Sequence, residues 1–260
     1  MKLFLKILLG IYLFMCIGLY FAQDRFLFLP DKLEEHHKFR LGEEVEIKVD
    51  DQVYLNALHI KTPTPKGVIL YLHGNKGSNR RCLRQATTLS GNDYDIFMPD
   101  YRGYGKSDGV IESEKQLYTD VQKVYDYLKT KYKESEIVIV GYSLGTGMAS
   151  FLAAHNNPKQ LILNSPFISI CDLKDRKFPI VPDLLVKYHL NNEENLKKVS
   201  IPTAIFHGTD DELIPYDSSE KLQKLNASLF QLYPLTNSGH RHAIFSDVFS
   251  DTVHRILQKS

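Results

Sequence analysis

The sequence has 260 residues, of which 43% are hydrophobic and 24% are charged, and its formal net charge is +1. This composition is ordinary for a folded protein, and the small net charge gives no reason to expect a nucleic acid as a partner. The three cysteines, Cys16, Cys82 and Cys171, form no C-x-x-C pair and no zinc-like cluster with histidines. The sequence therefore predicts neither a disulfide framework nor a bound metal or other cofactor.

Residues 1–24 differ in composition from the rest of the chain. An uninterrupted apolar stretch at residues 7–22 follows Lys2 and Lys6, and no A-x-A-like cleavage site comes after it. The stretch is slightly shorter than the roughly 20 residues that span a bilayer, yet longer than the usual core of a signal peptide. We interpret it as an uncleaved transmembrane signal anchor, with a cleaved signal peptide as the alternative.

The position of the lysines predicts how this anchor is oriented. Both lie on the short amino-terminal side of the apolar stretch, which is the side that stays in the cytoplasm. Residues 25–260 are therefore expected to form one domain on the extracytoplasmic side, in a periplasm or a lumen, tethered to the membrane. Cleavage of the leader would release the same domain as a secreted form.

From residue 45 onward, short β-like runs alternate with helical patterns. This rhythm indicates an α/β fold, with a mostly parallel central sheet covered by helices on both faces. Residues 45–49 and 53–60 are typical of an antiparallel pair, and residues 68–72 form an apolar run suited to a buried strand. Further strands are expected at residues 94–98, 137–140, 161–163, 203–206 and 229–233.

Helical periodicity predicts two helices and leaves one irregular segment. Apolar residues recur with a helical period between residues 113 and 131, and again in a closing helix after residue 243. Residues 166–200 are too long for a simple connection between neighbouring strands. We interpret this segment as a small cap or lid; an ordinary crossover helix with an irregular approach is the alternative.

The strongest chemical motif is Gly-Tyr-Ser-Leu-Gly at residues 141–145, which directly follows a predicted apolar strand and precedes a run of small residues. A tight strand-to-helix turn of this type needs glycines two positions on either side of the serine, because neighbouring backbone comes too close for a Cβ atom. Ser143 is thereby exposed at the end of the strand as a nucleophile. The N–H of Leu144 can donate to the oxyanion that forms when Ser143 attacks a carbonyl.

A serine nucleophile needs a histidine base, and the base needs a carboxylate partner. The loop after the strand at 203–206 carries Asp210, Asp211 and Glu212, each of which is a candidate for the carboxylate. The loop ahead of the closing helix carries His240 and His242, either of which is a candidate for the base. The residues alone leave both choices open.

From about residue 25 to its end, the chain resembles the α/β-hydrolase superfamily, and specifically its BEM46-like branch of membrane-anchored serine hydrolases. Three motifs carry this resemblance in order. Residues 73–80 (His-Gly-Asn-Lys-Gly-Ser-Asn-Arg) resemble the branch's oxyanion loop, residues 99–109 its loop after the fourth strand, and residues 141–145 its nucleophile elbow.

The resemblance implies specific roles. In His-Gly-x-x-Asp-x-x-x-Pro the carboxylate is Asp211, and in Ser-Gly-His the base is His240, while Asn75 supplies a second oxyanion N–H. The sequence departs from the family at His242, where an acidic or polar residue is usual. The resemblance also implies that the leader is a membrane anchor.

These observations predict a serine hydrolase that cleaves a carboxylic ester of a small molecule or lipid through an acyl-enzyme. An amidase or peptidase with the same triad is one alternative. A catalytically silent, membrane-tethered binding module is another. The sequence does not indicate an oligomeric state.

Overall fold

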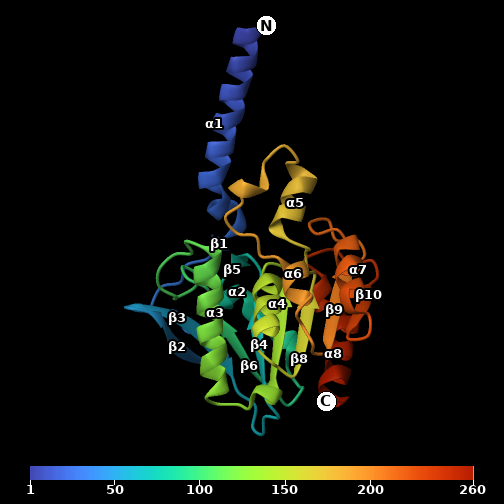
Figure 1. Cartoon of the computed structure of the whole chain (residues 1–260). Coiled ribbons are helices and arrows are strands. Elements are labelled where there is room, and N and C mark those ends of the chain that lie inside the picture. Colours follow the sequence, from blue (N-terminus) through green and yellow to red (C-terminus); the bar gives the residue numbers. More distant parts are fainter. Residues whose placement is uncertain (260) are drawn as a thin grey trace.

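An eight-stranded sheet forms the centre of the computed structural model, which describes residues 1–259 (Figure 1). The strand order is β10-β9-β8-β7-β4-β6-β3-β2. Neighbours from β10 to β6 pair in parallel, whereas β3 pairs antiparallel with both β6 and β2. The strands are β2 (Glu43–Asp50), β3 (Val53–Ile60), β4 (Val68–Leu72), β6 (Asp95–Pro99), β7 (Ile137–Tyr142), β8 (Gln160–Asn164), β9 (Thr203–Gly208) and β10 (Phe230–Leu235).

The central strands are buried on both faces because helices cover the sheet on each side. Every residue of β4, β6, β7, β8 and β9 is buried. One face packs against α3 (Glu114–Lys129) and α4 (Gly145–His155), and the other against α2 (Asn79–Ala86) and α8 (Asp247–Lys259). The shorter helices α6 (Asn192–Leu196) and α7 (Asp217–Gln223) lie on the connections that flank β9.

The first helix, α1 (Lys2–Leu27), projects away from this domain (Figure 1). It is long and apolar enough to cross a membrane, and Cys16 is its one buried residue. Beside its lower half lies the segment that carries α5 (Ile170–Lys177) and a 3-10 turn at Asp183–Leu185 (Figure 1). After α1, the two-residue strand β1 (Leu29–Pro30) pairs in parallel with β5 (Lys76–Gly77).

The fold class predicted from the sequence is confirmed. Each predicted strand occurs within one or two residues of its expected bounds, and the first two form the expected antiparallel pair. The closing helix begins at Asp247, since Ile244 lies in a separate 3-10 turn. The helices α2 and α7 and the β1–β5 pair were not predicted. Residues 166–200 contain α5 and α6, and their role as a cap stays a prediction.

Candidate active site

Ser143 lies in the turn between β7 and α4, at the carboxyl end of a central strand. Its φ of +51° is in the left-handed region, which residues other than glycine rarely adopt. The Ser143 N–H donates to Asn164 O at 2.9 Å, while the N–H and hydroxyl of Thr146 both donate to Ser143 O. These contacts hold the serine in a strained turn at the carboxyl edge of the sheet.

Gly145 lets this turn pack against the neighbouring strand. A Cβ atom at Gly145 would lie 2.0 Å from the carbonyl oxygen of Leu72, at the end of β4. That oxygen belongs to the backbone of a central strand, so it cannot move aside. The second glycine of the motif is therefore required by the close approach of α4 to β4.

His240 is the histidine that contacts Ser143. Its Nε2 lies 3.0 Å from Ser143 Oγ, and its Nδ1 lies 2.7 Å from Asp211 Oδ2. The Tyr142 hydroxyl donates to His240 O at 3.0 Å, and the His240 N–H donates to Glu212 Oε2 at 3.1 Å. With Nδ1–H donating to the carboxylate, Nε2 is free to accept the hydroxyl proton of Ser143.

The Asp211 carboxylate is buried and held from several directions. Its Oδ1 accepts from the N–H groups of Leu213 at 2.9 Å and Ile214 at 2.8 Å, and its Oδ2 lies 3.2 Å from His207 Nε2. Burial alone would raise the pKa of Asp211, but hydrogen bonds from His207 and His240, together with the electrostatic interaction with His240, lower it well below its usual range. Asp211 therefore remains a carboxylate throughout the neutral range.

The other candidates left open by the sequence have different surroundings. Asp210 is exposed, and its carboxylate accepts from the Thr209 hydroxyl. Glu212 contacts the backbone of His240, not its ring. His242 lines the same cleft as Ser143, and its N–H donates to Gly239 O.

Asn75 and Leu144 both line this cleft beside Ser143. Within residues 1–259 neither backbone N–H has a protein acceptor, which leaves both available to a substrate oxygen. The carbonyl of Asn75 accepts from the Leu29 N–H at 2.9 Å and the Tyr104 hydroxyl at 2.7 Å. The loop after β4 is thus held by β1 and by Tyr104.

Asp100 and Arg102, in the loop at residues 99–109, do not pair with each other. Arg102 instead makes a bidentate ion pair with Asp120 of α3, with Nε–Oδ2 and Nη2–Oδ1 distances of 2.6 and 3.0 Å. Asp100 is buried, accepts from the Asn79 N–H at 2.8 Å, and lies 3.3 Å from His73 Nε2. Arg102 thus connects this loop to α3, and Asp100 connects it to the start of α2.

The cleft around Ser143 has a volume of about 810 Å³, and the charged side chains that line it are lysines and arginines. Its lining includes five lysines and arginines but no aspartate or glutamate: Lys76, Arg81, Arg84, Lys177 and Arg241. Apolar side chains line the rest, from the end of α1 (Phe26, Leu27), from β1 (Leu29), from α5 (Ile170, Leu173), and from Phe167, Leu213, Ile214 and Phe245. The cleft therefore suits a ligand that is partly apolar and partly anionic.

Several of these residues could not be identified from the sequence. The basic side chains of the cleft come from α2, β5, α5 and the loop after β10, and no spacing along the chain links them. The support of Asp211 by His207 also depends on the loop geometry, although the two stand four positions apart. Within residues 1–259, no group of three or more His, Cys, Asp or Glu side chains could hold a metal ion.

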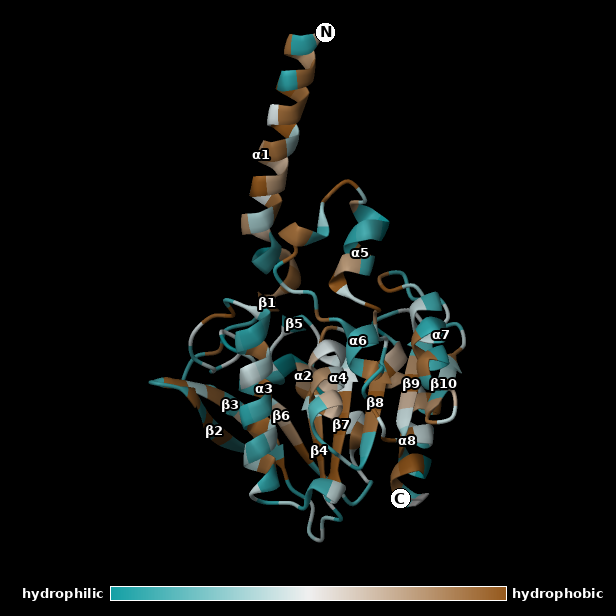
Figure 2. Ribbon diagram, viewed as in Figure 1, coloured by the Kyte–Doolittle hydropathy of each residue, from teal (hydrophilic) through white to brown (hydrophobic). Residues whose placement is uncertain are grey.

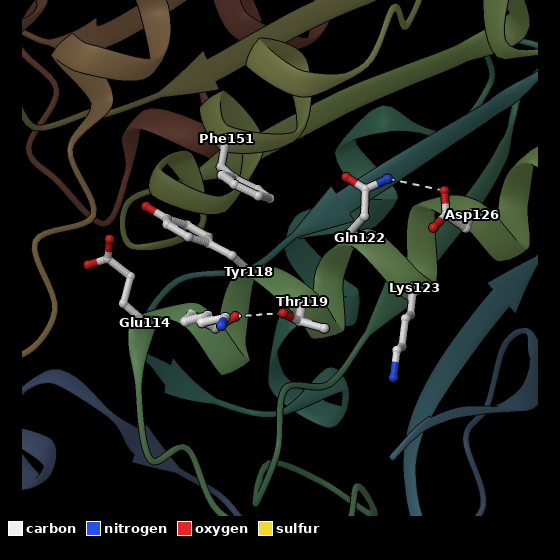
Figure 3. Close-up of a pocket in the computed structure, with 8 residues that line it drawn as sticks. Glu114, Tyr118, Thr119, Gln122, Lys123, Asp126 and Phe151 are labelled. Atoms are coloured by element: carbon white, nitrogen blue, oxygen red, sulfur yellow. Dashed lines mark hydrogen bonds between the residues drawn. The ribbon is translucent and has the colours of Figure 1, made fainter.

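A second hollow of about 520 Å³ lies on the outer surface of α3 and α4 (Figure 3). The rings of Tyr118 and Phe151 stack there with centroids 4.1 Å apart, and Gln122 donates to Asp126. None of the predicted site residues lines it. Because this hollow lacks a nucleophile paired with a base, it offers no comparable chemistry.

A family model described as "Serine aminopeptidase, S33" matches residues 63–188. The lysophosphatidylserine lipase ABHD12 of Danio rerio is 32% identical over 205 residues, which cover 67% of this chain and 53% of the relative. An uncharacterised protein of Mycobacterium tuberculosis is 27% identical over 228 residues, which cover 84% of this chain and 80% of the relative. The chain spans about half the length of the ABHD12 relatives that it matches.

Solved structures of esterases have the same fold. A Pyrococcus furiosus esterase superposes with a TM-score of 0.71 at 18% identity, covering 90% of this chain and 97% of that one. The ferulic-acid complex of Est1E from Butyrivibrio proteoclasticus superposes with a TM-score of 0.70 at 22% identity, covering 83% of this chain and 98% of that one. At such identities the likeness establishes the architecture.

Proposed function

Because the chain belongs to the α/β-hydrolase superfamily, we propose that it is a serine hydrolase that cleaves carboxylic esters with Ser143, His240 and Asp211 as its triad. The observation that carries this proposal is the pair of contacts made by His240. One ring nitrogen lies within hydrogen-bond distance of a strained serine, and the other contacts a buried carboxylate. This is the arrangement that converts a weak hydroxyl nucleophile into a strong one.

In the proposed reaction, Ser143 Oγ attacks the ester carbonyl while His240 Nε2 takes its proton. Asp211 holds the Nδ1–H and stabilises the imidazolium that forms. The backbone N–H groups of Asn75 and Leu144 donate to the oxyanion, and each donor of this kind contributes about 10²–10³ in rate. His240 then gives the proton to the leaving alcohol. In the second half of the reaction a water molecule, deprotonated by His240, attacks the acyl group, and the proton returns to Ser143 Oγ as the acid leaves.

The substrate that the cleft supports best is a lipid ester with an anionic group. Its apolar lining can bury an acyl chain, and its five cationic side chains attract negative charge. The name of the ABHD12 relatives, lysophosphatidylserine lipases, agrees with such a substrate. An aminopeptidase, which the family model's description suggests, must bind a substrate ammonium group, and the cleft lining has no carboxylate for that purpose.

We also propose that α1 anchors the enzyme in a membrane, with residues 25–260 on the extracytoplasmic side. The apolar helix with Lys2 and Lys6 at its start supports this arrangement. The proposal predicts that the protein stays in the membrane fraction in alkaline carbonate. It also predicts that protease added on the extracytoplasmic side degrades the domain. A soluble, leaderless product would contradict it.

The proposed nucleophile can be tested with a fluorophosphonate probe, which labels activated serines. We expect the wild type to be labelled and Ser143→Ala to remain unlabelled. Ser165→Ala is a matched control, because Ser165 also follows a strand with a φ of +51° but is fully buried. Equal labelling of wild type and Ser143→Ala would overturn the assignment, and absence of label from both would favour a silent binding module.

Substrate class is tested by a panel presented to the full-length enzyme in the same detergent. We expect monoacyl lipids with anionic headgroups to be hydrolysed faster than zwitterionic ones of equal chain length, and peptide anilides to be poor substrates. The variant Arg241→Gln should reduce the difference between the anionic and zwitterionic lipids. Faster cleavage of peptide anilides would replace the esterase proposal with a peptidase.

A further inference from the structure

The tip of the segment beside α1 exposes large apolar side chains. We call residues 178–185 the apex. Phe178, Ile180 and Leu184 in the apex are 53%, 69% and 83% exposed. Figure 2 shows apolar residues of this segment next to the apolar helix α1, at one end of the molecule. An exposed apolar cluster of this kind on a folded domain marks a surface that another apolar phase covers.

The apex is attached to α1 by hydrogen bonds along one side of the helix. The Tyr12 hydroxyl donates to Ile180 O at 2.8 Å. The Gln23 side chain donates to Leu185 O at 2.9 Å and accepts from the Lys187 N–H at 2.8 Å. Cys16, which lies one turn from Tyr12 on the same side of the helix, is the buried residue of α1. The apex thus lies along a defined face of α1.

The position of these contacts along α1 determines how deep the apex lies. The apolar stretch ends at Gln23 and Asp24, and Asp24 forms an ion pair with Lys187 at 3.1 Å, which places the water boundary there. Tyr12 stands 11 positions before Gln23. At 1.5 Å per residue, its contact with Ile180 lies about 16 Å beyond that boundary, roughly half of a 30 Å hydrocarbon core.

We propose that the apex is a second membrane-inserted element, which enters the outer leaflet of the bilayer alongside α1. This inference rests on the proposal that α1 spans the membrane. Since α1 and the apex are in contact, a bilayer that surrounds the upper part of α1 must either cover the apex or be displaced by it. Covering it removes the apolar surfaces of Phe178, Ile180 and Leu184 from water, which is the favourable outcome.

Polar groups near the apex have partners within the protein, which lowers the cost of insertion. The hydrogen bond between Tyr12 and the Ile180 carbonyl satisfies both groups where water is absent. The ammonium group of Lys174 lies 2.6 Å from the Asp183 carboxylate and donates to Val181 O at 2.8 Å. A paired charge of this kind can lie at the headgroup level, where an isolated one would be costly.

The position of the apex gives a lipid substrate a direct path to Ser143. The cleft is lined by Phe26 and Leu27 at the lower end of α1 and by Ile170 and Leu173 of α5, directly below the proposed inserted region. An acyl chain can therefore move between α1 and α5 from the leaflet into the cleft while remaining in contact with apolar side chains. This consequence rests on the proposed lipid esterase function, whereas insertion of the apex does not.

The inference is tested by placing an environment-sensitive fluorophore on single cysteines of the full-length protein. The three native cysteines are replaced by alanine, and Ile180→Cys is labelled with NBD and reconstituted in phosphatidylcholine–phosphatidylglycerol vesicles. Phe14→Cys on α1 serves as the membrane control. Val248→Cys on α8, an apolar position of the domain that is 53% exposed and does not line the cleft, serves as the aqueous control. Each labelled protein must keep the thermal transition of the wild type; Leu184→Cys is a second apex site.

We expect the apex label to be quenched several-fold more by doxyl-labelled lipids than the Val248 label, and to be protected from aqueous iodide like the Phe14 label. Iodide quenching of the apex label at the level of the Val248 label, with Phe14 protected, would overturn insertion of the apex and leave the anchor intact. Iodide quenching at all three positions would refute the anchor and the apex together. Because no outcome depends on catalysis, a failure of the esterase proposal is detected separately by the fluorophosphonate experiment.

Discussion

The carboxyl edge of the sheet and the segment beside α1 differ in how their side chains are held. At the sheet edge, Ser143, His240 and Asp211 are fixed by hydrogen bonds from neighbouring loops, and the Asp211 and His240 side chains are almost fully buried. In the segment around α5, none of the helix residues is buried, and the largest apolar side chains nearby face outward. The protein itself determines the geometry of the first region, whereas the second depends on what surrounds it.

This difference predicts where substitutions will be severe. A substitution at the sheet edge disturbs atoms that many neighbours hold in place. The surrounding structure therefore cannot relax to reduce the loss of stability. A change in the α5 segment alters contacts with solvent or membrane, so it should affect substrate access and leave folding intact. Paired substitutions, one in each region, test this contrast directly.

The largest expected effect is on catalysis, from Asp211→Asn. Loss of the carboxylate removes the group that orients His240, and we expect the kcat/KM of ester hydrolysis to fall by about 10³–10⁴. Asp210→Asn is the matched control, since that side chain is exposed and contacts Thr209; its kcat/KM should stay within about twofold of the wild type. A comparable loss in Asp210→Asn would mean that the carboxylate is misassigned.

The same residue predicts a pH dependence of stability. Burial would raise the pKa of Asp211, but its hydrogen bonds with His207 and His240 lower it overall. A lowered folded-state pKa means that the carboxylate stabilises the fold above the ordinary value of about 4, and that this contribution is lost as the pH falls below it. The difference in Tm between wild type and Asp211→Asn should therefore shrink between about pH 6 and pH 3 in thermal scans.

The next largest effect is on folding, from Gly145→Ala. The added Cβ would lie 2.0 Å from a backbone oxygen of β4, so the elbow must distort, at a cost of about 3 kcal/mol or more in unfolding free energy. Gly18→Ala in α1 is the matched control, because no other atom lies within 4 Å of the added methyl group. Denaturant unfolding should show a large loss for the first variant and almost none for the second. Equal losses would mean that the close approach of α4 to β4 does not determine the cost of the added methyl group.

Two arginines allow the contrast to be tested with ion pairs. Arg102 bridges Asp120 and Asp50 with its side chain 6% exposed, and Arg176 of α5 bridges Asp172 and Asp217 with its side chain 33% exposed. Arg102→Met leaves the buried Asp120 without its partner and should cost about 3 kcal/mol of unfolding free energy. Arg176→Met should cost about 0–1 kcal/mol.

A double variant separates the loss of an attraction from the presence of an unpaired charge. In Arg102→Met with Asp120→Leu, no buried charge is left without its partner, so most of the lost stability should return. If the double variant is no more stable than Arg102→Met alone, packing around α3 is responsible for the loss, and not the charge of Asp120.

The sheet could be predicted because its strands carry a strong local signal. Runs such as those at residues 68–72 and 137–140 are apolar at every position, which suits strands that helices cover on both faces. The helix α2 gave no such signal, since it is mostly polar and buries only Asn79, Cys82 and Ala86. The buried residues do share one face of the helix, but that face carries an asparagine and two small side chains, which is too little apolar surface to indicate a helix in so short a run.

The candidate site was predictable in part for the same reason. The elbow around Ser143 is a local motif, so the sequence alone identified it. The choice among Asp210, Asp211 and Glu212 depends on which side chain the loop after β9 turns toward His240, and three adjacent acidic residues do not encode that direction. The resemblance to a known family pointed to Asp211, and it is Asp211 whose carboxylate contacts the ring.

The smallest expected effect concerns the length of the acyl chain. Leu173 of α5 is half-buried and lines the cleft, so Leu173→Ala removes apolar surface that a long chain would contact. A loss of about 1 kcal/mol of binding to the transition state lowers kcat/KM about fivefold for a long-chain ester. An acetate ester lacks the long chain that this contact requires and should be cleaved at the wild-type rate.

Leu184→Ala is the matched control for this measurement. Leu184 belongs to the same segment but is 83% exposed and does not line the cleft, so its replacement should not change the chain-length profile of esters in detergent solution. If both variants shift the profile equally, the segment acts by its general apolar character. A shift confined to Leu173→Ala would mean that α5 contacts the acyl chain, so that the less buried of the two regions sets substrate preference and the proposed triad at the sheet edge does not.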